Sequence, residues 1–298
     1  MAYSSMMPVD PSVSIEEVEE LLEVMRRQES GIYRRNDYIA ASEALRENVV
    51  DATWRQRIVE WMYGVVDHCS LRRDSVAIAT FYLDICVDRG LIDSRQDFQL
   101  AAMTALQLAI KLYDSTVVKL DSMVKLGRGL FTEEDVVAME SKMLSSLGWQ
   151  VHPPTPVCFL RQYLRLLPVS VAPMTRYMIA EVTRFISEIS VCLYKFIKYP
   201  PSVLAYAGML LAMQRIDLAT LPMWQRQQIF TVMAKSARVD VSSPAVMEAV
   251  AQLQSSLEKN ISLKELMDTI DAQRHVGYGN VRVNDYEHGA MSSPRDVR

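Results

Sequence analysis

The sequence predicts an all-α protein made of two tandem five-helix bundles, with one helix before them and a disordered tail after them. Three observations support this fold class. Apolar residues recur at helical spacing along most of the 298 residues. The chain has 10 glycines and 12 prolines against 18 methionines, and methionine fills irregular gaps in helical cores. A proline-rich run, Pro153 to Pro156, divides the periodic segments into two sets.

An N-terminal helix is expected over residues 14–30. Ser14 and Glu17 have the spacing of a capping box, in which each side chain satisfies the other residue's backbone N–H. Leu21, Leu22 and Met25 then form an apolar stripe. This helix could pack on a binding partner or on the second bundle, and the sequence leaves both possibilities open.

The first bundle is expected over residues 45–151. Its first two helices follow the spacing of Trp54, Ile58 and Trp61 and a second apolar segment that ends near Gly90. The third, 98–113, is rich in alanine and is predicted to be central, because small side chains let neighbouring helices approach closely. A short helix over 119–126 and a fifth helix that begins after Thr132 complete the bundle.

The second bundle is expected over residues 155–260. Thr155 and Pro156 suit the cap and first position of a helix that follows a rigid proline-rich linker. Further helices are predicted near 156–167, 172–192, 200–215, 223–236 and 243–258. The third of these again contains small residues, which suggests a diverged internal duplication. Residues 272–298 are polar and contain glycine, which predicts a disordered tail.

Composition excludes several functions. The net charge of −4 disfavours a general nucleic-acid binder. Four scattered histidines and four cysteines without a CxxC pair predict no metal site and buried, reduced thiols, which indicates an intracellular protein of the nucleus or cytoplasm. No apolar segment reaches membrane-spanning length, and the first residues do not resemble a secretory signal. Catalytic pairs and phosphate loops are also missing, so neither an enzyme nor a cofactor is expected.

Four stretches and the linker resemble the cyclin family, in the order and spacing of its first box. They are Trp54-Arg-Gln-Arg-Ile-Val-Glu-Trp61-Met62, Phe81-Tyr-Leu-Asp84, Ala109-Ile-Lys-Leu-Tyr-Asp114 and Ala138-Met-Glu-Ser-Lys-Met-Leu144 with the following Leu147-Gly-Trp149. Over 160–258 the resemblance is mostly one of helix order. The resemblance implies a regulatory subunit that binds and activates a cyclin-dependent protein kinase, in cell-cycle control, without chemistry of its own.

The resemblance also implies roles for particular residues. Arg55 would form a structural ion pair with Asp84. Lys111 and Glu140 would be the main polar contacts to the kinase, with Asp114 as a secondary one. Lys111 lies next to Leu112 and Glu140 next to Met139, and such apolar neighbours would fill the core of the interface.

In this family, the first helix also forms an apolar patch that docks kinase substrates or inhibitors. The matching positions are Trp54, Ile58 and Trp61. Arg57 occupies a position that is usually aliphatic, so the docking function stays an open alternative to a purely structural role.

Two other functions compete with kinase activation. A cyclin-fold scaffold or transcription-associated protein would act without a cell-cycle kinase, but a promoter-binding member would need a basic groove, which the acidic balance disfavours. An enzyme on a helical scaffold would need a catalytic constellation, and the sequence offers none.

Overall fold

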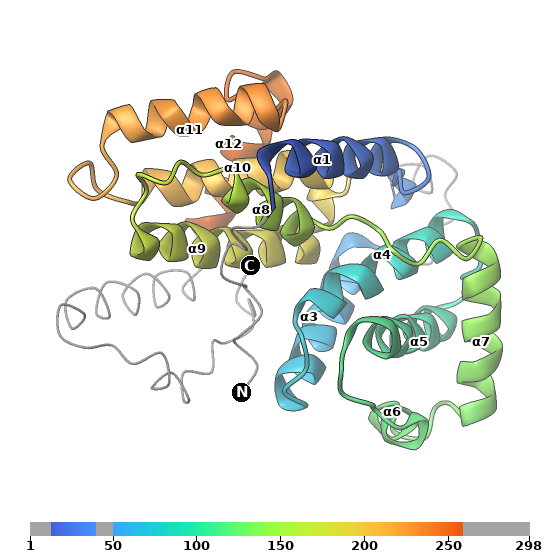
Figure 1. Cartoon of the computed structure of the whole chain (residues 1–298). Helices are drawn as coiled ribbons and strands as arrows, with labels where there is room; N and C mark the ends of the chain where they lie inside the picture. Colours follow the sequence, from blue (N-terminus) through green and yellow to red (C-terminus); the bar gives the residue numbers. More distant parts are fainter. Residues whose placement is uncertain (1–12, 40–49, 259–298) are drawn as a thin grey trace.

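The computed structural model describes residues 13–39 and 50–258. The predicted tail at 272–298 lies outside these residues. The described chain is helical, and Figure 1 shows the two predicted bundles side by side, with α1 lying on the second. The first bundle contains α3 (Ala52–His68), α4 (Asp74–Asp88), α5 (Arg95–Tyr113), α6 (Leu120–Leu126) and α7 (Glu133–Ser146). The second contains α8 (Pro156–Arg165), α9 (Pro173–Cys192), α10 (Pro201–Gln214), α11 (Met223–Ser236) and α12 (Pro244–Leu257), with a short 3-10 helix, η1 (Tyr194–Phe196), after α9.

The alanine-rich helix α5 is the centre of the first bundle, as its composition predicts. Its alanines are fully buried, and it packs against α3, α4, α6 and α7. Glycine at position 90 has a φ of +68°, so it ends α4 in the left-handed conformation that other residues adopt at a cost. This turn sends the chain into α5.

Helix α10 has the same central place in the second bundle. Gly208 lies against α9, where an added Cβ would come within 3.2 Å of Thr183 and 3.3 Å of Ile186. The absence of a side chain therefore sets how closely α9 and α10 approach. The prediction of a central small-residue helix is confirmed for the first bundle, and the second bundle has the same arrangement.

The N-terminal helix α1 (Ile15–Ser30) packs on the second bundle, which is one of the two possibilities that the sequence left open. Its buried residues Val18, Leu22 and Met25 join the core of that bundle. At its end, the Glu29 carboxylate accepts hydrogen bonds from the backbone N–H of Ser202 at 3.0 Å and from the Ser202 hydroxyl. Glu29 thus satisfies a free N–H in the first turn of α10. The expected capping box of Ser14 and Glu17 is also present.

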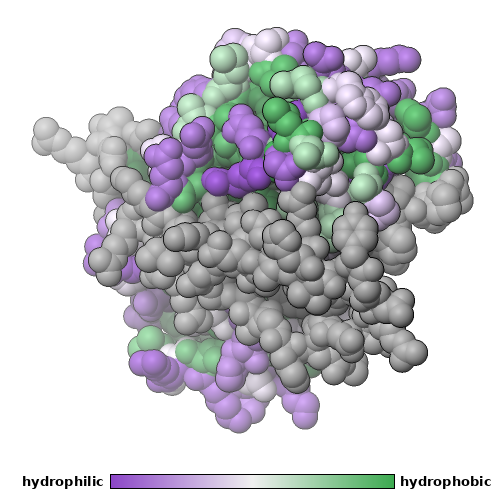
Figure 2. All heavy atoms as spheres, turned by 90° about the vertical axis from the view of Figure 1, so that its left-hand side faces the viewer, coloured by the Kyte–Doolittle hydropathy of each residue, from purple (hydrophilic) through white to green (hydrophobic). Residues whose placement is uncertain are grey.

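Apolar side chains reach the surface of the second bundle both at its loops and on its helices. Val169 and Leu218 lie in loops, whereas Met223 and Trp224 begin α11 and Met247 lies on α12. In Figure 2, the upper part of the molecule shows apolar side chains interspersed with hydrophilic ones. Apolar residues that are exposed in this way are ordinary on globular proteins, so they mark no docking site.

None of the helices in the described ranges combines the length and the apolar character needed to cross a bilayer. The four cysteines are free thiols. Cys86 and Cys192 are buried as expected, but Cys69 is exposed. The expectation fails for Cys69 because it lies just after the end of α3, beyond the buried stripe of that helix.

Burial raises the pKa of Glu29, and the hydrogen bonds from Ser202 only partly oppose this effect. We expect Glu29→Ala to lower the free energy of unfolding by about 1–3 kcal/mol, because the Ser202 N–H loses its acceptor in a buried place. Glu29→Gln keeps an acceptor and adds no charge, so it should unfold close to the wild type. Urea denaturation measures both variants.

Comparing Glu29→Gln with the wild type at several pH values gives a second test. A raised carboxyl pKa in the folded state means that the contribution of Glu29 to stability is fully present below its unfolded pKa and is lost as pH rises through the folded value. The stability of Glu29→Gln relative to wild type should therefore increase as pH rises above the ordinary value of 4.5. A difference that is independent of pH would contradict the buried position of this carboxylate.

Candidate functional site

The structure brings Lys111 and Glu140 together on the surface of the first bundle. Lys111 lies in the last turn of α5 and Glu140 in the middle of α7, and the ammonium nitrogen lies 2.8 Å from Glu140 Oε1. The Lys111 side chain is 58% exposed and that of Glu140 20% exposed. An ion pair this accessible contributes little to folding, so stability alone gives no reason for it.

The pair keeps free capacity for a partner. Lys111 uses one of its three N–H donors on Glu140, and Glu140 Oε2 accepts no hydrogen bond from the described residues. Leu112 beside Lys111 is 42% exposed, and Val137, one turn from Glu140 on α7, is 57% exposed. Exposed apolar side chains thus lie beside the charged pair, the combination that the expected kinase contact would use.

The prediction that Met139 contributes apolar surface beside Glu140 is wrong. Met139 is buried in the core of the first bundle, where it cannot fill an interface with another protein. The reason is helical geometry, since consecutive residues on a helix point about 100° apart. Val137, rather than Met139, supplies the exposed apolar surface of α7 near Glu140.

Asp114 lies one turn beyond Lys111, where α5 ends. Its Oδ2 accepts a hydrogen bond from the Arg72 backbone N–H at 2.8 Å, and its Oδ1 accepts one from the Thr116 N–H at 2.9 Å. The carboxylate therefore ties the loop between α3 and α4 to the end of α5. Asp114 lies close to Lys111 in the chain, and both of its carboxylate oxygens accept hydrogen bonds from backbone N–H groups of this protein.

Trp54, Ile58 and Trp61 lie on one face of α3, as their spacing predicts. All three are half-buried and pack against the core of the first bundle. The Arg95 guanidinium lies 4.8 Å from the centre of the Trp54 ring, which is a cation–π contact. The stripe therefore combines a structural contact with partly exposed aromatic surface.

Arg55 and Asp84 form a buried pair at the junction of the two bundles. Arg55 Nε lies 2.7 Å from Asp84 Oδ1, and Arg55 Nη2 donates to Oδ2 at 2.9 Å. Arg55 Nη1 also donates to the carbonyls of Val191 and Cys192, at 3.0 and 3.3 Å, at the end of α9. The Arg55 guanidinium therefore connects α3 and α4 with the second bundle.

Electrostatics keep the Arg55 guanidinium charged. Burial lowers the pKa of the Arg55 guanidinium, but the Asp84 carboxylate outweighs burial, so the pKa lies above its ordinary value. The Tyr38 hydroxyl donates to Asp84 Oδ1 at 3.0 Å, and burial raises the pKa of Tyr38 well above its usual range. Tyr38 therefore remains a protonated donor, and Asp84 has three hydrogen bonds.

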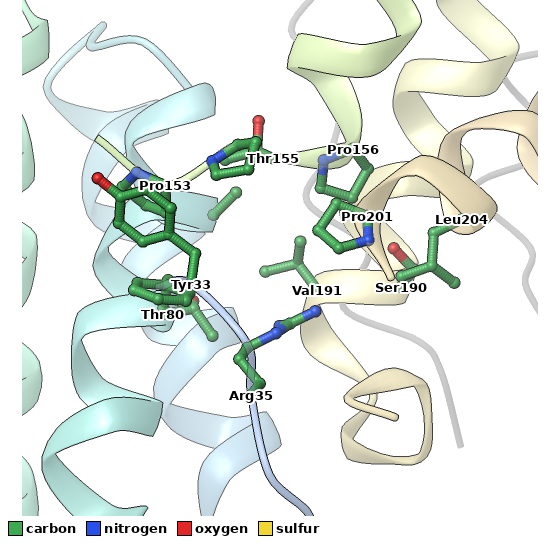
Figure 3. Close-up of a pocket in the computed structure, with 13 residues that line it drawn as sticks. Tyr33, Arg35, Thr80, Pro153, Thr155, Pro156, Ser190, Val191, Pro201 and Leu204 are labelled. Atoms are coloured by element: carbon green, nitrogen blue, oxygen red, sulfur yellow. The ribbon is translucent and has the colours of Figure 1, made fainter. Parts of the chain in front are cut away.

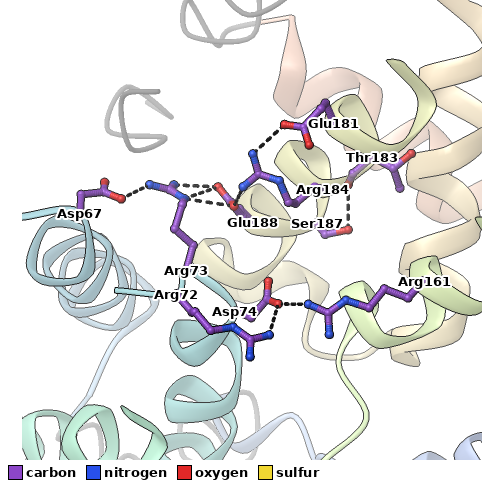
Figure 4. Close-up of polar contacts among 10 residues, drawn as sticks. All are labelled: Asp67, Arg72, Arg73, Asp74, Arg161, Glu181, Thr183, Arg184, Ser187 and Glu188. Carbon is purple, nitrogen blue, oxygen red and sulfur yellow. Dashed lines mark hydrogen bonds and ion pairs between the residues drawn. The ribbon is translucent and has the colours of Figure 1, made fainter. Parts of the chain in front are cut away.

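A second set of ion pairs crosses the same junction (Figure 4). Arg73, just before α4, donates to both oxygens of Glu188 on α9, the shortest contact being 2.7 Å, and its Nη1 lies 2.5 Å from Asp67. Arg184 lies between Glu181 and Glu188 on α9, at 2.9 and 2.8 Å. These contacts hold the start of α4 against the middle of α9.

The sequence reasoning missed this junction set. A signal was present on α9, because Glu181, Arg184 and Glu188 have the three- and four-residue spacing of helical ion pairs. The partner Arg73 is more than a hundred residues away, and the fold alone reveals that contact. Within the described ranges, no group of three or more histidine, cysteine or acidic side chains is arranged to hold a metal ion.

Comparison with known proteins gives the family. Two consecutive five-helix bundles, joined through a buried arginine–aspartate pair, have the architecture of a double cyclin-box protein. The model of the cyclin N-terminal domain matches residues 20–152, and that of the cyclin C-terminal domain matches residues 154–268. The two models together cover most of the chain, which belongs to the cyclin family.

Individual relatives are distant. The chain is 25% identical over 174 residues to Cyclin-A2-3 of Arabidopsis thaliana, covering 58% of this chain and 38% of that one. It is 26% identical over 210 residues to Cyclin-B2-1 of Oryza sativa subsp. japonica, covering 68% and 47%. The chain thus spans less than half the length of these curated relatives. The X-ray structure of a viral cyclin from herpesvirus saimiri has the same fold, with a TM-score of 0.58 at 11% identity, over 80% of this chain and 96% of the viral one.

The buried pair predicts a large asymmetry between charge removal and pair replacement. We expect Asp84→Asn to lower the free energy of unfolding by about 3–5 kcal/mol, because Arg55 is then left buried without a counter-charge. The double variant Arg55→Met, Asp84→Leu should lose less than the sum of the single variants Arg55→Met and Asp84→Leu. Urea denaturation of these three variants, of Asp84→Asn and of the wild type measures this coupling.

Lys125 provides the matched control. It forms an exposed ion pair with Asp121 at 2.7 Å on α6. Lys125→Ala should leave the unfolding midpoint unchanged, because solvent screens such pairs. If Asp84→Asn were as mild as this control, the junction would not depend on the buried pair.

Proposed function

We propose that this chain is the regulatory subunit of a cyclin-dependent protein kinase, which it binds and activates in cell-cycle control. The observation that carries the proposal is the exposed Lys111–Glu140 pair across α5 and α7, at 2.8 Å. Membership of the cyclin family supports a kinase as the partner. As a regulatory subunit, the chain contributes binding surface, and the catalytic residues belong to the kinase.

The binding surface would centre on the last turn of α5 and the middle of α7. Leu112 and Val137 would lose their exposed apolar area to the kinase, and this burial would supply the main favourable free energy. Lys111 and Glu140 would use their free donors and acceptor on polar groups of the kinase at the rim. Asp114 would act as a secondary contact, provided that its bonds to the α3–α4 loop persist.

Activation follows from selective binding. A protein kinase is active when the helix that bears its lysine-pairing glutamate is in place and its activation loop is ordered. A subunit that binds this arrangement more tightly than the inactive one shifts the population towards it. The junction of the two bundles, held by Arg55 and Arg73, would give the kinase a rigid surface against which to order these elements.

The face of α3 that carries Trp54, Ile58 and Trp61 would be a second surface, for substrates or inhibitors of the kinase. Its aromatic side chains are half-exposed, which suits an anchor for a short apolar peptide motif. On this proposal the protein acts in the nucleus or cytoplasm and needs neither nucleic acid nor membrane.

Affinity capture of the full chain from cells of its source, followed by mass spectrometry, tests the partner. A cyclin-dependent kinase should be recovered, and adding the purified chain should raise the phosphotransfer rate of that kinase. The chain alone should show no phosphotransfer from ATP. If no kinase is recovered, or if the recovered kinase is unaffected, the proposal is wrong.

The double variant Lys111→Ala, Glu140→Ala tests the surface. We expect it to weaken binding of the recovered kinase about tenfold or more, because two polar contacts to the partner disappear together. Isothermal titration calorimetry measures the affinity, and circular dichroism checks that the helices remain.

Lys142→Ala is the matched control for this experiment. Lys142 is exposed on the same helix, α7, but two residues from Glu140 and therefore on the far side of the helix. Its substitution should leave the affinity unchanged. Undiminished binding by the folded double variant would disprove this location of the interface.

A further inference from the structure

A pocket lies where the two bundles, the linker and the segment after α1 meet (Figure 3). It encloses an empty volume of about 440 Å³, part of which is open to solvent. Much of its wall is proline, which has no N–H to donate, and apolar side chains. Two groups with hydrogen-bond donors stand out among the lining residues: Arg35 and Thr80.

Arg35 enters the pocket from the segment between α1 and α3, and its side chain is 15% exposed. Among the described residues its guanidinium donates no hydrogen bond. Its one ion pair is with Asp84 Oδ2, at 3.8 Å. Since a guanidinium has five N–H donors, most of its hydrogen-bonding capacity is unused in a largely buried place.

The nearby carboxylates of Asp84 and Glu29 do not accept hydrogen bonds from Arg35. Asp84 already accepts two hydrogen bonds from Arg55 and one from Tyr38. Glu29 is bonded to Ser202 and lies beyond ion-pair distance of Arg35. Burial lowers the pKa of Arg35, and the Arg55 charge adds to this effect, while Asp84 opposes it. Asp84 thus faces two arginines, and Glu29 is the other carboxylate that acts on Arg35, from beyond ion-pair distance.

Thr80 gives a second and independent sign of an absent partner. It lies on α4, is 1% exposed, and its hydroxyl has no hydrogen-bond partner. Leaving a buried hydroxyl unpaired is unfavourable, and few buried polar groups in native proteins are left so. Its place in the lining of the same pocket as Arg35 indicates that one ligand could satisfy both groups.

We propose that this pocket binds a small oxyanion, a carboxylate or phosphate group, through charge-assisted hydrogen bonds from Arg35 and a hydrogen bond from Thr80. An oxyanion has several acceptor atoms and a negative charge, so it matches both the planar guanidinium and the hydroxyl. The surrounding proline and apolar wall excludes much of the water that would otherwise compete. The site does not overlap the Lys111–Glu140 surface, and it stands independently of the proposed kinase partner.

Calorimetric titration of the full chain tests this site. The probes are inorganic phosphate, acetate and O-phosphoserine, at constant ionic strength maintained with sodium chloride. Binding of phosphate and phosphoserine would identify a phosphate group, free or carried on an organic stem, whereas binding of acetate alone would identify a carboxylate. Arg35→Gln should raise the dissociation constant of the bound probe about tenfold or more.

Two further variants make the result decisive. Thr80→Val removes the hydroxyl with little change of shape, so it should weaken binding several-fold, and it should not lower the unfolding midpoint in the absence of the probe. Arg34→Gln, at the exposed neighbour of Arg35, is the matched control and should leave binding unchanged. The proposal fails if no probe binds, or if Arg35→Gln binds as the wild type does. Should Arg35→Gln not fold, unchanged binding by Thr80→Val would overturn it.

Discussion

The buried Arg55 guanidinium is the contact on which the rest of the structure depends. It bonds to a carboxylate in its own bundle and to two carbonyls at the end of α9 in the other bundle. A buried charge needs its partners in place, because leaving it unpaired costs more than most single contacts contribute. The position of α9 is therefore coupled to the packing of α3 and α4. The ion pairs of Arg73 with Glu188 and Asp67 also hold α9 against the first bundle.

This coupling separates two kinds of polar residue in the first bundle. Arg55 and Asp84 are buried and fully bonded, so they hold the structure together. Lys111 is exposed and Glu140 is partly exposed. Both have spare hydrogen-bonding capacity, and they lie in the last turn of α5 and the middle of α7, two helices that the buried core fixes. Residues of the first kind give rigidity, and residues of the second kind are available to other molecules. The pocket at Arg35 is intermediate, since its cation is largely buried and yet incompletely bonded.

Much of the fold was predictable from the sequence because its signals are local. The cap at Ser14, the alanines of α5 and the small residues of α10 each define an element or its place through nearby residues. The contacts between the bundles were not predictable in this way. Arg73 and Glu188, or Glu29 and Ser202, are far apart in the chain, and only tertiary packing brings them together.

The candidate site shows the same division. The resemblance to the cyclin family pointed to Lys111 and Glu140, but it did not reveal that Met139 is buried and Val137 exposed. That distinction depends on the orientation of α7 against α5, which a motif match does not contain. Arg35 belongs to no motif in the sequence, so nothing there pointed to it. Its unused donors become visible only when the pocket and the bonding of Asp84 are known.

The packing of α1 on the second bundle has a consequence for how the chain is made. Helix α1 is synthesised well before the surface that buries Leu22, which is formed by later residues that include Ser202, the partner of Glu29, at the start of α10. At roughly 5–20 residues per second, synthesis of the intervening stretch takes on the order of ten seconds. During that interval the apolar stripe of α1 is without its native cover. Helix α1 thus reaches its final environment only after the second bundle has formed.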